Sequence, residues 1–104
     1  MIHVTFFLGD KKKVAGFKIN GHGPEYVCSA VSILAINTIN CLEKFTDDDF
    51  FYDYDEHGGF IDFKFIDVIK VSHDARLLMD VFEFGCRDVV NQYSDHVKLS
   101  EVGL

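Results

Sequence analysis

The chain has 104 residues, a formal net charge of −7 and a hydrophobic content of 48%. This length is typical of one domain, so we expect residues 1–104 to fold as a single domain. An acidic chain repels nucleic-acid phosphates and favours basic partners, which predicts no direct nucleic-acid binding. No stretch looks both long and apolar enough to span a membrane, and the N-terminus lacks the pattern of a signal peptide.

The first half of the chain predicts a β-hairpin followed by a helix. Residues 2–8 are rich in β-branched and aromatic side chains, residues 14–20 alternate, and the charged segment 9–13 joins them as a turn. Pro24 and Glu25 suit the first turn of a helix that continues to about Leu42. Apolar residues lie around much of the circumference of this helix, so we expect the helix to be buried against the sheet and against a second surface, such as another subunit.

The second half repeats the same order of elements. Residues 50–55 and 60–65 alternate around the turn residues 56–59, which predicts a second hairpin. Ser72 suits the N-cap of a second helix, and residues 97–102 form a short last strand. We therefore expect an α+β fold of two layers, with helices packed on a mostly antiparallel sheet in the order ββαββα(β).

One segment suggests chemistry, because a histidine and a cysteine flank a turn that leads into the first helix. His22 lies between two glycines, and Cys28 follows near the helix start. A helix N-terminus and a nearby imidazolium both favour the thiolate, which is the nucleophilic form of cysteine. This is the pairing used in covalent acyl transfer, in which backbone N–H groups at the helix start would stabilise the oxyanion.

Each of these residues also has a structural interpretation. Cys28 suits a buried face as a small hydrophobic residue, and His22 suits a solvated turn. Cys41 lies at the far end of the first helix, where the dipole opposes thiolate formation, and Cys86 lies within the second helix. Three cysteines without paired spacing indicate free thiols and a cytoplasmic location. No metal-ligand or nucleotide-binding spacing is present, so we expect no cofactor and no metal.

The segment Gly21-His22, followed by residues 27–32 (VCSAVS), resembles the GH…VCAAVS signature of the bacterial ribosomal-processing cysteine protease (Prp) family. The opening residues 1–4 and the stretch Tyr54 to Phe60 (YDEHGGF) are similar to the start of the family and to its D-x-G-G hairpin. The length and the order of elements also agree. The resemblance therefore covers most of the chain.

This resemblance implies a small homodimer that removes the N-terminal extension of a large-subunit ribosomal protein in the cytoplasm. It implies Cys28 as the nucleophile and His22 as the general base. The implied substrate is a basic extension that is cut after aromatic residues, and the acidic charge of the chain suits it. Glu25 occupies a place that is often acidic in the family, and Ser32 matches the serine of the signature.

The chain departs from the family in one respect. Many members carry a longer, glycine-containing segment between the histidine and the cysteine, whereas here only residues 23–27 intervene. A shorter loop has less freedom to bring His22 onto Cys28. An alternative function therefore stays open: a non-catalytic dimeric binding module for a basic ribosomal or ribosome-assembly partner.

Overall fold

The structure is a computed structural model that describes residues 1–55 and 59–104. A short 3-10 helix, Asp10–Lys12, joins the first two strands. The remaining elements are β1 (Ile2–Leu8), β2 (Val14–Gly21), α1 (Glu25–Phe45), β3 (Phe50–Tyr54), β4 (Phe60–Phe65), α2 (His73–Gln92) and β5 (Val97–Gly103).

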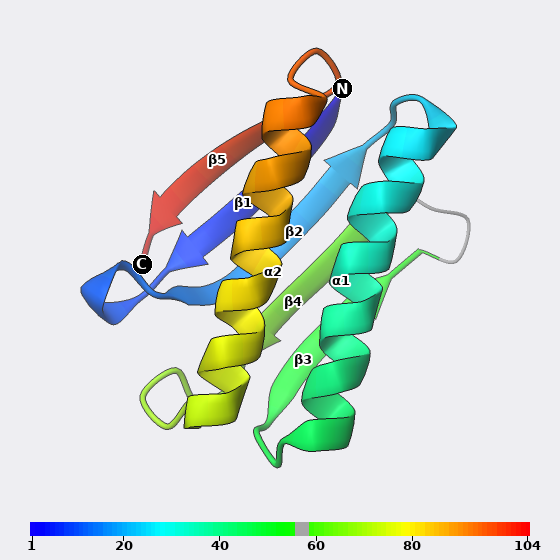
Figure 1. Cartoon of the computed structure of the whole chain (residues 1–104). Coiled ribbons are helices and arrows are strands. Elements are labelled where there is room, and N and C mark those ends of the chain that lie inside the picture. Colours follow the sequence, from blue (N-terminus) through cyan, green and yellow to red (C-terminus); the bar gives the residue numbers. More distant parts are fainter. Residues whose placement is uncertain (56–58) are drawn as a thin grey trace.

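The strands form one five-stranded sheet in the order β3-β4-β2-β1-β5. Strands β1 and β5 pair in parallel, and the other three pairs are antiparallel. Both helices pack side by side on the same face of the sheet (Figure 1). The expected α+β fold, with helices on a mostly antiparallel sheet in the order ββαββα(β), is therefore confirmed.

Aromatic side chains of the sheet and of α2 form the centre of the core. Phe17 of β2 stacks on Phe63 of β4, with ring centroids 5.1 Å apart, and touches Phe82 of α2 at 4.3 Å. Phe82 also meets the ring of Phe6 edge to face. All four rings are almost completely buried. This cluster joins the helix layer to the two central antiparallel pairs of the sheet.

Helix α1 begins at Glu25, one residue later than the sequence predicted, because Pro24 is the N-cap residue in an extended conformation. By length and composition alone, α1 is long and apolar enough to cross a membrane, contrary to our expectation. In this fold the apolar residues of α1 pack against other parts of the protein. One face packs on the sheet, and Leu34 packs against Gly85 of α2, where a Cβ atom would lie 3.2 Å from Leu34 Cδ2. The second surface that buries α1 is thus α2.

Helix α2 begins where the sequence predicted. The Ser72 hydroxyl accepts a hydrogen bond from the Ala75 amide, as an N-cap does. Asp48 accepts hydrogen bonds from the amide and from the hydroxyl of Ser72, which ties the helix start to the loop after α1. The predicted turn at residues 56–59 falls mostly on residues 56–58, which lie outside the described residues.

The aromatic cluster predicts a large stability effect at Phe82. Replacing Phe82 by Ala removes both ring contacts and leaves a cavity, so we expect the free energy of unfolding to fall by about 3–5 kcal/mol. The matched control is Phe45→Ala, because Phe45 is 62% exposed at the end of α1. The control should change stability by no more than about 0.5 kcal/mol. Chemical denaturation monitored by circular dichroism measures both, and equal losses in the two variants would contradict this account of the core.

Candidate active site

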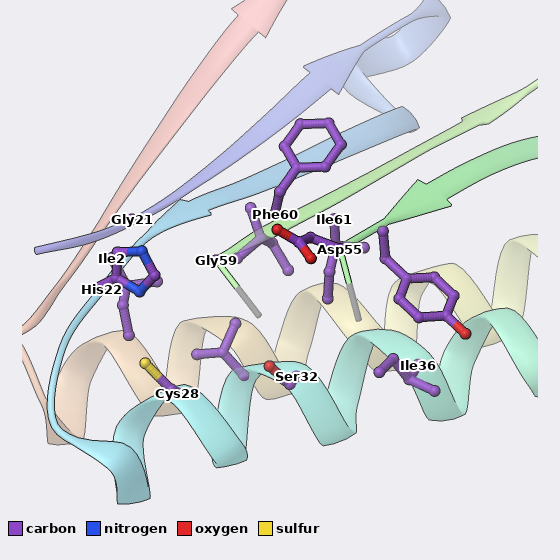
Figure 2. Close-up of a pocket in the computed structure, with 13 residues that line it drawn as sticks. Ile2, Gly21, His22, Cys28, Ser32, Ile36, Asp55, Gly59, Phe60 and Ile61 are labelled. Carbon is purple, nitrogen blue, oxygen red and sulfur yellow. The ribbon is translucent and has the colours of Figure 1, made fainter. Parts of the chain in front are cut away.

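A cavity of about 300 Å³ lies between the first turns of α1 and the ends of β2, β3 and β4. Most of its walls are apolar side chains of the sheet and of α1, including Ile19, Val31, Ile36 and Ile61. His22, Cys28, Ser32 and Asp55 bring polar groups to it. Figure 2 shows Cys28 and Ser32 on successive turns of α1, with His22 beyond the end of β2. A largely apolar cavity with a few polar groups is the usual form of a binding site.

The main chain around His22 is held against the start of β1. Strand β2 ends at Gly21, whose φ of +95° favours glycine. A Cβ atom there would collide with the carbonyl oxygen of Met1. The backbone nitrogen of Met1 donates a 2.7 Å hydrogen bond to the His22 carbonyl. These contacts place the exposed His22 side chain at the cavity.

Cys28 is the fourth residue of α1 and closes its first turn. Its amide donates a 3.0 Å hydrogen bond to the carbonyl of Pro24. Its partly buried thiol donates to the carbonyl of Gly23, with 3.5 Å between the two heavy atoms. Tyr26 packs edge to face on Tyr93, with ring centroids 5.7 Å apart, and so holds the start of α1 beside the end of α2. Cys28 is therefore neither a deeply buried core residue nor a freely solvated one.

The structure brings His22 and Cys28 to the same cavity despite the short loop between them. Figure 2 shows the Cys28 sulfur pointing toward the side of the cavity where the His22 ring lies. We expected the five-residue loop to restrict the approach of His22 to Cys28, yet this loop allows both side chains to line the same cavity. Their assignment as nucleophile and base stays a prediction.

The backbone amides at the start of α1 differ in whether they have a hydrogen-bond partner. Those of Val27 and Cys28 both donate to the Pro24 carbonyl. Those of Glu25 and Tyr26 have no hydrogen-bond partner within residues 1–55 and 59–104. An amide that already donates to a carbonyl binds an oxyanion less well. Of the backbone amides that we expected to stabilise the oxyanion, those of Glu25 and Tyr26 are therefore the available donors.

The other cysteines lie away from this cavity. Cys86 is buried in α2, and burial, with a smaller contribution from the charge of Glu83, raises the pKa of its thiol to about 12. The Cys41 thiol is partly buried and lies 4.0 Å from the Asn37 side-chain oxygen. Within the described ranges, no group of three or more His, Cys, Asp or Glu residues is arranged to hold a metal ion.

The sequence predicts a hairpin at the Tyr54–Phe60 stretch but does not indicate that this stretch lies at the site. Tyr54, Asp55, Gly59 and Phe60 all line the cavity. Pairing of β4 with β2 brings them there, because Asn20 lies opposite Phe60. His57 of the same stretch lies outside the described residues. Only the order of strands in the sheet reveals that these four residues lie at the same cavity as His22.

Comparison with known proteins agrees with this fold. A family model described as cysteine protease Prp matches residues 1–98, nearly the whole chain, which places the chain among the cysteine proteases. Within that class it belongs to the Prp family. No curated protein matches the chain.

Solved structures share the fold over almost their whole length. One is an essential ribosomal processing protease Prp of S. aureus with a covalently linked product peptide, 22% identical, with a TM-score of 0.86. The alignment covers 97% of this chain and 99% of that one. The same protease with a substrate peptide is 20% identical, with the same TM-score and coverage. SMU.848 of Streptococcus mutans is 26% identical, with a TM-score of 0.86 and coverage of 100% and 96%.

The environments of the three thiols predict the order of their alkylation. In the folded protein at neutral pH, iodoacetamide should label Cys28 first and Cys86 last, because the raised pKa and the burial of Cys86 keep it a protonated, inaccessible thiol. Peptide mapping by mass spectrometry measures the three rates. Labelling in denaturant is the control and should abolish the difference. A Cys86 rate equal to that of Cys28 in the folded protein would be the contrary result.

Proposed function

We propose that this protein is a cysteine endopeptidase that removes the N-terminal extension of a large-subunit ribosomal protein in the cytoplasm. The single observation that carries the proposal is the placement of Cys28 and His22 at one cavity in a member of a cysteine protease family. The S. aureus structures support the choice of substrate class, because those proteins are described as ribosomal processing proteases and hold substrate and product peptides.

The proposed reaction begins with a proton transfer from Cys28 to His22. Rotation about the Cβ–Sγ bond of Cys28 breaks the hydrogen bond of the thiol to the Gly23 carbonyl and turns the thiol proton toward the imidazole ring. His22 accepts the thiol proton, and the thiolate attacks the scissile carbonyl carbon. The negative charge passes to the carbonyl oxygen, where the amides of Glu25 and Tyr26 donate to it at the positive end of the α1 dipole.

Collapse of this intermediate breaks the peptide bond. The protonated His22 gives its proton to the leaving amine, and Cys28 keeps the acyl group as a thioester. Water then attacks the thioester carbonyl while His22 accepts a proton from it. Release of the carboxylic acid returns the proton to Cys28, so the enzyme ends as it began and no cofactor is consumed.

The cavity and the charge of the chain suit the proposed substrate. A volume of about 300 Å³ with mostly apolar walls can hold an aromatic side chain next to the scissile bond. The net charge of −7 attracts a basic extension over a distance of several ångströms, within the screening length of the medium.

A peptide that copies the N-terminus of the ribosomal protein from the same organism tests the assignment. Wild type should cleave it, and Cys28→Ala and His22→Ala should each lower kcat by about 10³-fold or more, because nucleophile and base act as one unit. Cys41→Ala is the matched control and should keep the wild-type rate, since Cys41 lies outside the cavity. Mass spectrometry of the products measures the rate and the cleavage site.

Two outcomes would contradict the proposal. Equal cleavage by wild type and Cys28→Ala removes Cys28 as the nucleophile. If wild type binds the peptide but does not cleave it, the alternative function, a non-catalytic binding module for a basic partner, is supported instead.

We also propose that the protein acts as a homodimer. Leu77, Val81 and Phe84 recur at helical spacing on the outer side of α2, and each is more than half exposed. Ile33 of α1, next to the Leu34 that packs on Gly85, is 66% exposed. Apolar side chains grouped on an outer surface are typical of an interface between subunits.

The dimer proposal predicts the effect of a charge in this surface. Val81→Glu should convert a dimer into a monomer, because a carboxylate would be buried without a partner in the interface. Ile69→Glu is the control, since Ile69 is 90% exposed in the loop that precedes α2 and is not part of the apolar surface formed by Leu77, Val81 and Phe84. Sedimentation velocity measures the mass of each variant. A wild-type monomer, or a Val81→Glu dimer of unchanged affinity, would contradict the proposed interface.

A further inference from the structure

Gly59 makes an unusually close approach to His22. A Cβ atom on Gly59 would lie 2.8 Å from Cε1 of the His22 ring and 3.1 Å from Nε2. Distances below about 3 Å are far inside van der Waals contact, so no side chain fits between this backbone and the ring. The imidazole ring therefore packs directly on the backbone of Gly59. Both residues line the same cavity as Cys28 (Figure 2).

Strand pairing explains why Gly59 lies at this place. In the antiparallel pair of β2 and β4, Ile19 lies opposite Ile61 and Asn20 opposite Phe60. Continuing this register brings Gly59 beside Gly21, one residue before His22. The approach is therefore a consequence of the pairing of β2 with β4. Gly59 also has a φ of +92°, a conformation that favours glycine.

The main chain of His22 is fixed independently of its ring. Gly21 lies against the Met1 carbonyl, and the Met1 nitrogen donates to the His22 carbonyl. With the main chain held on the side of β1, a side chain at position 59 would displace the ring and leave the backbone in place. The space that glycine leaves empty is thus the space that the His22 ring occupies.

We propose that Gly59 is a positioning residue for His22: its lack of a side chain lets the imidazole ring lie where it can reach Cys28. This inference rests on the proposed roles of His22 and Cys28. Gly59 takes no part in the chemistry itself. It acts through the ring, so its substitution should change the rate of the chemical step more than the binding of substrate.

The test compares Gly59→Ala with Gly59→Asn. Asn adopts positive φ more readily than Ala, yet both add the Cβ atom that meets the ring. We expect both variants to lower kcat by about 10²-fold with KM little changed, because small displacements of a catalytic group have effects of this size. Gly103→Ala is the matched control and should keep the wild-type kcat, since a Cβ atom on Gly103 has no neighbour within 4 Å. An Asn variant with wild-type kcat would show that backbone strain alone matters and would overturn the proposal.

The rate of Cys28 alkylation at neutral pH gives a readout that needs no substrate. A histidine ring within reach of the thiol can accept its proton as the sulfur reacts. Gly59→Ala should lower this rate, and His22→Ala should lower it equally. An unchanged rate in a folded Gly59→Ala protein would overturn the proposal. If wild type fails to cleave the peptide while Gly59→Ala still lowers the alkylation rate, the proposed substrate is wrong and the positioning role stands.

A double-mutant comparison covers the case in which the variants are unstable. Removing the His22 ring should remove the collision, so Gly59→Ala should lower the melting temperature less in a His22→Ala background than in wild type. The same loss in both backgrounds would show that the added methyl group does not meet the ring, and the proposal would fail.

Discussion

Strand β2 is hydrogen-bonded on both sides, and the position of every candidate catalytic group follows from this. It pairs with β1 over its whole length and with β4 over the half that leads toward Gly21. Its end is therefore fixed relative to the start of β1 and to Gly59. Because α1 begins only four residues after Gly21, the first turn of that helix must lie over the same end of the sheet. His22 and Cys28 line the same cavity there as a consequence of this pairing.

The three cysteines show how position in the fold separates residues of the same type. Cys86 lies in the core, where burial raises the pKa of its thiol to about 12 and removes it from chemistry near neutral pH. Cys41 lies near the end of α1, away from the cavity. Cys28 alone combines partial exposure, a cavity and the N-terminal turn of a helix. Reactivity requires all three conditions, since a thiolate needs both stabilisation and access to its target.

The glycines at the site allow two segments of the chain to approach each other closely. Gly21 lies against the Met1 carbonyl, and Gly59 lies against the ring of His22. Both have positive φ, so each position excludes a side chain for conformational reasons and for lack of space. The short loop before Cys28 works with this arrangement. Because Met1 holds the His22 main chain on one side and Gly59 lies against the His22 ring on the other, a long connection is not needed to place His22 at the cavity that Cys28 lines.

Local patterns in the sequence determined most of the secondary structure. Alternation marked the strands, helical spacing marked α1 and α2, and Ser72 marked the start of α2. These patterns involve only residues that are close together in the sequence, so they can be recognised without knowledge of the fold. The start of α1 was placed one residue early, because proline suits both the first turn of a helix and the position before it.

The sequence by itself also pointed to His22 and Cys28, through their spacing and their resemblance to a family signature. It did not reveal that Asp55 and Gly59 face them, or that only two amides remain free at the start of α1 among the described residues. These facts depend on the pairing of β2 with β4, which joins segments about 40 residues apart. Residue pattern predicts that strands form, whereas strand order and register depend on the packing of the whole core, and only the tertiary structure decides them.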